Sequence, residues 1–212
     1  MNKNRIVLGI ESSCDETSVS IVREKSSSDQ EILSNIVNSQ IKLHEKNGGV
    51  IPEIAARSHS MIIDQLIERS LTKAKIKLNQ VDAVAATAGP GLLGGLIVGV
   101  VAAKTLASVL KKPFIAINHL EGHALSAKLE HQIEYPYLLL LVSGGHTEFT
   151  IIKSFNDYKR IGTTLDDALG EAFDKSARVL GLKYPGGPEI EKYALQGDEN
   201  KYIFPKPIIN QK

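Results

Sequence analysis

Residues 5–23 read RIVLGIESSCDETSVSIVR, and this stretch decides the fold. Residues 5–10 are mostly apolar, as in a buried strand, whereas residues 17–23 alternate apolar and polar side chains, as in a strand with one buried face. The mostly polar Glu11–Glu16 segment between them predicts a tight turn joining two strands. A third strand is expected at residues 31–39.

The chain then changes to a helical pattern. A long amphipathic helix is expected from Ile51 to about Leu71, with Pro52 in its first turn. Alternating strands and helices follow, at residues 83–88, 94–110, 114–118 and 120–129. Three strands followed by a helix, a strand, a helix and a strand is the order of a ribonuclease-H-like unit.

The opening pattern recurs at residues 137–153, which read YLLLLVSGGHTEFTIIK. Two strands flank a glycine turn there, and a third strand at 158–163 and a helix at 165–180 are expected next. The repeat predicts an α/β fold of duplicated actin-like lobes, the ASKHA architecture. The first lobe is expected at residues 1–130 and a second, incomplete lobe at residues 131–212.

The composition is that of a globular protein: 212 residues, 42% hydrophobic and 23% charged, with a net charge of +1. It excludes a disordered tail, a collagen-like repeat and a disulfide scaffold. The single cysteine, Cys14, favours a reducing compartment, and no secretory signal is recognisable, so a cytoplasmic location is expected. Residues 83–103 carry no charge and have the length of a membrane span, but Gly89-Pro90-Gly91 favours a buried strand, loop and helix.

His119 and His123 are the sharpest local signal. Histidines four residues apart on a helix face the same side, where both imidazoles can reach one cation. The other interpretation is a surface or capping feature, because the spacing alone is weak evidence. A zinc-protease motif is disfavoured, because Leu120 rather than glutamate follows the first histidine.

Two turns are candidates for phosphate binding. The glycines of Ser143–Thr147 expose backbone N–H groups to an anion, although an ordinary hairpin turn has the same sequence character. The Glu11–Glu16 turn occupies the equivalent place in the first unit, and its acids suit a metal-linked phosphate or a polar substrate; the other interpretation is a solvated acidic turn. The glycine-rich Gly89–Gly95 segment is not a Walker loop, because no Lys-Ser or Lys-Thr follows it.

Charged clusters leave alternatives open. The helix expected at 165–180 would place Asp167, Glu171 and Asp174 on one face. This face could bind a cation or a hydroxyl-rich ligand. The other interpretation is a solvated face on which Lys175 and Arg178 pair with the acids. Residues 69–112 hold seven bases and one acid, which suits either a phosphate-facing patch or two solvated helix ends.

Taken together, six segments are more specific than any single motif. They closely resemble the universal tRNA N6-adenosine threonylcarbamoyltransferase family, long described as O-sialoglycoprotein endopeptidases, over residues 5 to about 197. The segments are GIESSCDET (9–17), PEIAARSH (52–59), GPGL (89–92), NHLEGH (118–123), VSGGHT (142–147) and GEAFDK (170–175).

The resemblance implies transfer of a threonylcarbamoyl group from threonylcarbamoyl-AMP to N6 of the adenosine next to the anticodon, in tRNAs that read codons beginning with A. It implies a metal site, Fe²⁺ or Zn²⁺, with His119 and His123 as two ligands. Glu11 is implied to be a catalytic residue, an acidic side chain of the cleft near the reacting carbon. It also implies partners: tRNA, a paralogous actin-like subunit and a small P-loop ATPase subunit, with no membrane. The residues that resemble adenylate contacts are Val142, Ser143, Gly144, Gly145, His146, Asp174, Gly187 and Glu191.

Members of the family are usually longer by more than a hundred residues. That further part supplies an aspartate that completes the metal site and an asparagine near the adenylate, and we therefore expect a C-terminally truncated relative. Two alternatives to the transferase remain: an inactive fragment that retains partner binding, and a metallopeptidase.

Overall fold

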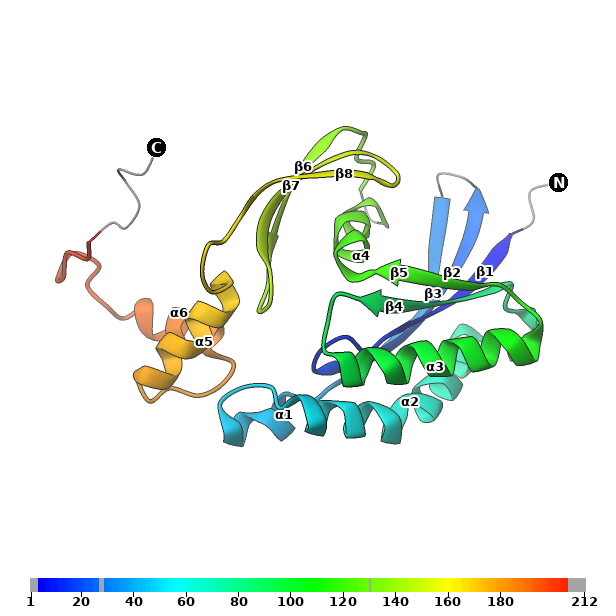
Figure 1. Ribbon diagram of the computed structural model, residues 1–212, viewed down its shortest axis with the longest axis horizontal. Helices are drawn as coiled ribbons and strands as arrows, with labels where there is room; N and C mark the ends of the chain where they lie inside the picture. The colour runs from blue at the N-terminus through cyan, green and yellow to red at the C-terminus, as the bar shows by residue number, and fades with distance from the viewer. Residues whose placement is uncertain (1–3, 27–28, 130, 206–212) are drawn as a thin grey trace.

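The computed structural model describes residues 4–26, 29–129 and 131–205, and it contains two sheets (Figure 1). The first sheet has the order β3-β2-β1-β4-β5. Its strands are β1 (Arg5–Glu11), β2 (Glu16–Ser26), β3 (Asp29–Ser39), β4 (Ala83–Gly89) and β5 (Phe114–Asn118). The second sheet is a meander of β6 (Tyr137–Val142), β7 (Thr147–Ser154) and β8 (Asp157–Thr163).

Strand β1 lies at the centre of the first sheet, and its register fixes where the chain's polar groups meet. It pairs antiparallel with β2, with Glu11 opposite Ser18, and parallel with β4, with Val7 opposite Ala83. Strand β5 is parallel to β4, and Asn118 lies beside Gly89. The carboxyl ends of β1, β4 and β5 therefore share one edge of the sheet, which is where open α/β sheets bind ligands.

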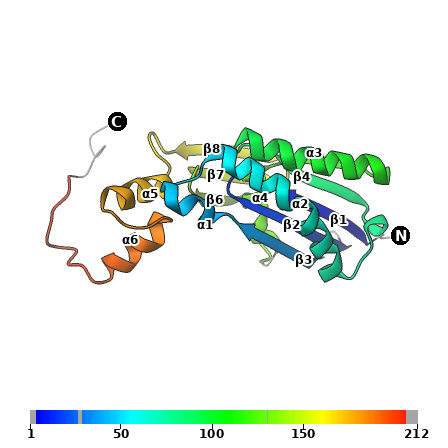
Figure 2. The same ribbon diagram turned by 90° about the horizontal axis from the view of Figure 1, so that it is seen from below.

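Two helices, α2 (Pro52–Ala74) and α3 (Leu93–Leu110), cover the same face of the first sheet (Figure 2). Between them and the sheet lies a core whose fully buried members include Leu8, Val19, Ile21, Leu66 and Val84. The order of strands and helices expected for a ribonuclease-H-like unit is confirmed. The short helix α1 (Ile41–His44), followed by a 3₁₀ turn at Glu45–Asn47, was not expected from the sequence.

Helix α3 is long and apolar enough to cross a membrane by length and composition. It packs instead against β4 and α2, through a stripe of small residues at every fourth position: Gly95, Gly99, Ala103 and Ala107. The expected strand, loop and helix are present and the strand is buried, but the helix is buried on one side only. The opposite side of α3 exposes Leu93, Ile97 and Val101.

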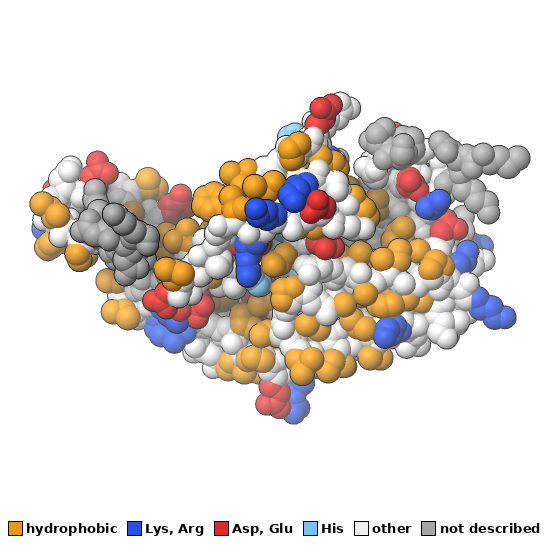
Figure 3. Space-filling view, turned by 45° about the horizontal axis from the view of Figure 1, so that its top comes forward, with side chains coloured by type: hydrophobic (Ala, Val, Ile, Leu, Met, Phe, Trp, Pro, Cys, Tyr) orange, Lys and Arg blue, Asp and Glu red, His pale blue; other side chains and the backbone are white. Residues whose placement is uncertain are grey.

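The second half of the chain repeats the opening of the first. Hairpin β6–β7 closes with Val142 opposite Thr147, as β1–β2 closes with Glu11 opposite Ser18. Helices α5 (Leu169–Val179) and α6 (Gly186–Ala194) follow the meander. Apolar side chains remain exposed on the second sheet, and hydrophobic groups are visible across the face seen in Figure 3; those on the sheet are Leu138, Leu140, Val142, Phe149 and Ile161.

One boundary was predicted wrongly. The helix expected from Leu165 begins at Leu169, so Asp166 and Asp167 precede it. Local side-chain hydrogen bonds compete with helix formation there. The Thr164 hydroxyl donates to the Asp167 carbonyl (2.7 Å), and the Leu169 amide donates to the Thr147 hydroxyl (2.8 Å). The proposed division between lobes at residues 130 and 131 stays a prediction.

Replacing Gly95 by alanine tests the close contact of α3 with the first turn. A Cβ at Gly95 would overlap the Ser12 carbonyl oxygen, which is backbone and has no room to withdraw. We expect Gly95→Ala to lower the free energy of unfolding in urea by about 1–3 kcal/mol. Gly122→Ala in α4 (His119–Ser126) is the matched control: its Cβ would meet nothing within 4 Å, so helix propensity should keep stability equal or raise it. Equal losses in both variants would contradict the packing argument.

Candidate functional site

The turn between β1 and β2, residues 11–16, is held against the start of α3. The Leu92 amide donates to the Ser13 carbonyl (2.7 Å), and the Ser12 hydroxyl donates to the Gly95 carbonyl (2.9 Å). From the other side, the Gln40 amide donates to the Asp15 carbonyl (3.0 Å). Because neighbouring elements hold the turn at several points, the side chains that it carries are fixed in position.

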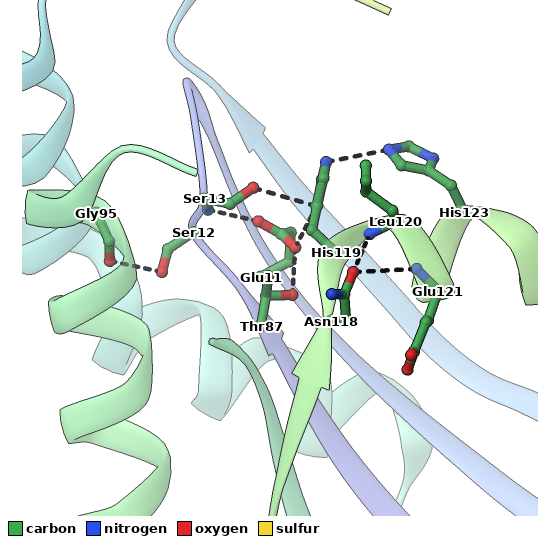
Figure 4. Close-up of polar contacts among 10 residues, drawn as sticks. All are labelled: Glu11, Ser12, Ser13, Thr87, Gly95, Asn118, His119, Leu120, Glu121 and His123. Atoms are coloured by element: carbon green, nitrogen blue, oxygen red, sulfur yellow. Dashed lines mark hydrogen bonds and ion pairs between the residues drawn. The ribbon is translucent and has the colours of Figure 1, made fainter. Parts of the chain in front are cut away.

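Glu11 lies at the end of β1 and points toward α4 (Figure 4). The Ser13 amide donates to its Oε1 (2.5 Å), the Thr87 hydroxyl donates to its Oε2, and His119 Nδ1 lies 3.2 Å from the same Oε2. Burial disfavours the charged form, but the hydrogen bonds from His119, Ser13 and Thr87 outweigh it and lower the pKa of Glu11 to about 2. Glu11 is thus a carboxylate at neutral pH, better suited to orient a neighbour than to accept a proton as a general base.

Helix α4 brings the two histidines together. Asn118 caps it by accepting hydrogen bonds from the Leu120 (2.9 Å) and Glu121 (3.4 Å) amides, so His119 stands in the first turn at the sheet edge. The Nε2 atoms of His119 and His123 lie 3.1 Å apart. Since Glu11 can only accept, His119 carries its proton on Nδ1 and leaves the Nε2 lone pair directed at His123.

The electrostatics suit a cation between these rings. Burial lowers the pKa of His123, and the nearby rings of His119 and His146 lower it further. The negative charge of Glu11 acts in the opposite direction. Metal ions bind the neutral imidazole, and a ligating histidine commonly donates its other ring N–H to a carboxylate, as His119 can to Glu11. The described residues contain no group of three or more His, Cys, Asp or Glu that could hold a metal; at this point they bring together the pair His119 and His123.

The second turn, Ser143–His146, faces the same histidines. The His146 amide donates to the Ser143 hydroxyl (3.0 Å), and the Ser143 amide donates to the His146 carbonyl (2.8 Å). The His119 and His146 rings lie 6.5 Å apart, centre to centre. A Cβ at Gly144 or Gly145 would meet nothing within 4 Å, so the glycine side of the turn is open to a ligand. Val142, at the end of β6, is 47% exposed beside it.

The structure separates the acidic residues that the sequence placed on one face. Lys175 pairs with Asp167 (2.7 Å) and Glu171 (3.1 Å), whereas Asp174 accepts from the Gly186 amide (2.7 Å) at the start of α6. The lysine pairs are exposed and fit the solvated-face interpretation.

Gly187 and Glu191, the two expected adenylate contacts on α6, differ in their exposure to solvent. Gly187 is half-buried in the first turn of α6, next to the Gly186 amide that Asp174 binds, and Glu191 is exposed one turn further on. The expected partner Arg178 does not pair with these acids. Its Nη2 donates instead to the carbonyl of Gly48, which belongs to the first half of the chain (2.5 Å).

Further residues at the site were missed by sequence reasoning. A cavity of about 550 Å³ lies between the two halves and includes Gly48, Asp174, Arg178 and Tyr184 in its lining. Burial raises the pKa of Tyr184, and the Asp15 and Asp174 carboxylates raise it further. No local pattern distinguishes Tyr184. Thr87 had a usable signal, because it is a polar residue near the carboxyl end of the apolar strand β4.

The two strand–turn–strand units, with His119 between their turns, define an actin-like protein of duplicated ribonuclease-H-like units. The chain belongs to the tRNA N6-adenosine threonylcarbamoyltransferase family, whose model matches residues 31–212. It is 59% identical over 202 residues to the tRNA N6-adenosine threonylcarbamoyltransferases of Brucella ovis and Brucella suis, covering 95% of this chain. The chain spans about half, 56%, of the length of these curated relatives.

Two solved structures resemble the chain at low sequence identity. One is a Pseudomonas aeruginosa protein described as similar to peptidase YEAZ, with a TM-score of 0.48 and 19% identity, covering 74% of this chain and 64% of that one. The other is the Aquifex aeolicus member of the Ppx/GppA family, with a TM-score of 0.46 and 13% identity, covering 82% of this chain and 55% of that one.

The thiol of Cys14 offers a direct test of the environment of the first turn. The residue is exposed, yet burial of the sulfur and the Asp15 carboxylate raise its pKa from 9.0 to about 12. Less thiolate forms at pH 8, and the greater nucleophilicity of a high-pKa thiolate offsets only part of the loss. We expect iodoacetamide to label folded Cys14 at least about tenfold more slowly than the unfolded chain in urea.

The pH dependence should follow the same shift. Labelling of the folded chain should keep accelerating above pH 10, where labelling of the unfolded chain has levelled off. Equal rates and equal pH profiles in the two states would contradict the assigned environment.

Proposed function

We propose that the chain acts in transferring the threonylcarbamoyl group of threonylcarbamoyl-AMP to N6 of the adenosine adjacent to the anticodon, in tRNAs reading codons that begin with A. In this reaction N6 attacks the carbamoyl carbon, the bond from that carbon to the phosphate oxygen breaks, AMP leaves and N6 loses a proton. Family membership supports the reaction class. The main structural support is that Glu11, the two α4 histidines and the open glycine turn meet at one edge of the sheet.

The proposal gives each group a task that its geometry supports. Residues 142–146 would hold the adenylate through the open Gly144–Gly145 side of the turn, since exposed glycine amides can bind an anion. Asp174, Gly187 and Glu191 would contact the nucleotide, with Asp174 lining the cavity between the halves. Glu11 would orient His119 relative to the carbamoyl group that reacts. Positioning of reactants supplies much of the rate in such transfers.

A metal ion is part of the proposal, Fe²⁺ or Zn²⁺, with His119 and His123 as two of its ligands. When bound, it would polarise an oxygen of the reacting group as a Lewis acid. The chain's own contribution is two lone pairs from one helix face, with the first ring oriented by the Glu11 carboxylate.

A second candidate is an inactive fragment that keeps the partner-binding surface of the first lobe. It is favoured by the exposed apolar side of α3, where Leu93, Ile97 and Val101 are 73%, 51% and 57% exposed at helical spacing. We propose a paralogous actin-like subunit as the partner for this face and a small P-loop ATPase subunit as a further member of the complex, in the cytoplasm.

A metallopeptidase is disfavoured by the direction of Glu121. Its side chain points away from both imidazoles (Figure 4), whereas a peptidase glutamate must reach the metal-bound water.

Metal binding can be measured on the chain itself. We expect His119→Ala and His123→Ala each to weaken Zn²⁺ binding, titrated calorimetrically and checked by elemental analysis, by at least about 100-fold, because each removes one of two ligands that the described residues supply. His131→Ala removes an exposed histidine outside the site and serves as the control. Unchanged binding in the first two variants would refute the ligand assignment.

The transfer reaction needs a reconstituted assay. Purified chain would be combined with partner subunits, an enzyme that makes threonylcarbamoyl-AMP, threonine, bicarbonate, ATP and unmodified tRNA. We expect the modified nucleoside to appear by mass spectrometry, and Glu11→Gln to slow its formation at least about tenfold through lost positioning. If a full-length relative makes the product and this chain never does, the transferase proposal fails and the partner-binding fragment stands.

A further inference from the structure

We infer that His59, on α2, is a positioning residue that fixes the shape of the 11–16 turn and through it the place of Glu11. The inference rests on the proposed function, because it assigns His59 a part in holding that site. It concerns a side chain that touches neither the α4 histidines nor the second turn. His59 is fully buried, with 0% of its surface exposed.

Two hydrogen bonds connect the His59 ring to the turn and to the strand that follows. Its Nε2 lies 3.0 Å from the Cys14 carbonyl oxygen, and its Nδ1 lies 2.7 Å from the Thr17 hydroxyl. A carbonyl only accepts, so Nε2 carries the proton and Nδ1 of the neutral ring accepts from Thr17. The ring therefore bridges the two ends of the segment from Cys14 to Thr17 with defined polarity.

A buried relay sets the same polarity from the other side. The Ile51 amide donates to His44 Nδ1 (3.3 Å), His44 Nε2 donates to the Gln40 side-chain oxygen (3.2 Å), and the Gln40 amide nitrogen donates to His59 Nδ1 (3.3 Å). The Thr17 hydroxyl (2.7 Å) and the Gln40 side-chain nitrogen (3.3 Å) share the single lone pair of His59 Nδ1, and the Thr17 bond is the shorter. The series of hydrogen bonds runs from the backbone amide of Ile51 to the carbonyl of Cys14. Gln40 and His44 are 1% and 0% exposed, so water does not replace these bonds.

The packing around His59 restricts the 11–16 turn to one conformation. A Cβ at Gly95 would come within 3.1 Å of the His59 ring as well as overlapping Ser12, so helix α3, the ring and the turn are in mutual contact. Burying polar groups of this kind destabilises a fold unless all of them are paired, and a paired network specifies a unique geometry. Here the geometry specified is that of the Ser13 amide and hydroxyl, which contact Glu11 and His119.

The test compares His59→Leu, which removes both hydrogen bonds, with His59→Gln, whose amide can still donate to the Cys14 carbonyl. Ser70→Ala is the matched control: Ser70 is also fully buried on α2 and bonded to Ser34 (2.6 Å) and the Val19 carbonyl (3.3 Å), away from the turn. The readouts are the labelling rate of Cys14, which reports on the turn without any ligand, and kcat and KM in the transfer assay.

We expect His59→Leu to label at least about tenfold faster than the parent and to lose kcat with little change in KM, with His59→Gln restoring both toward parent values. Ser70→Ala should keep the parent labelling rate and kcat even where its stability falls. A folded His59→Leu with unchanged labelling and kcat, or Ser70→Ala with the same effects, would overturn the inference.

Long-range ¹H–¹⁵N spectra of the labelled parent chain test the inference without any variant. They should show His59 neutral with its proton on Nε2; a proton on Nδ1, or on both nitrogens, at pH 7 would overturn the inference even if the leucine variant fails to fold. If the parent makes no transfer product, the proposed function fails, while labelling and tautomer still decide the role of His59.

Discussion

The contact on which the rest of the site depends is the close approach of α3 to the Ser12–Ser13 segment. It requires residues without a Cβ at Gly91, Gly95 and Gly99, where added side chains would overlap Ser12 or Ser13. The helix backbone then meets the turn backbone directly, and Leu92 and Gly95 exchange hydrogen bonds with it. From that fixed turn follow the place of Glu11, then the tautomer of His119, and then the direction of the lone pair that faces His123.

Which groups of the site are charged at neutral pH depends on the hydrogen bonds and charges around each of them. Glu11 keeps a negative charge because three hydrogen bonds outweigh its burial, whereas Cys14 and Tyr184 stay neutral because burial and nearby carboxylates act in the same direction. The Glu11 carboxylate, which lies beside His119, therefore stays charged at neutral pH. This arrangement favours orientation of a ligand over proton transfer by the turn itself.

Much of the fold could be predicted from hydrophobic periodicity, because strands β1, β4 and β6 are short apolar runs and α2 begins at a proline. The helical spacing of His119 and His123 and the glycine turn were also readable, since both are local patterns. The start of α5 was not, because the hydroxyls of Thr164 and Thr147 hold the chain out of helix up to Leu169. Thr87, Tyr184 and the role of His59 depend on contacts between distant segments, which a single sequence does not display.

The bond between Glu11 and His119 joins residues 108 positions apart, whereas His119 and His123 are neighbours on one turn of helix. Closing so long a loop is entropically unfavourable and is achieved only with the rest of the sheet. An unfolded or partly folded chain can therefore present the histidine pair, but not the carboxylate that orients it. If a cation binds between those rings, as we propose, only the folded chain would hold it fully, so its affinity would be coupled to folding and its binding would raise the melting temperature.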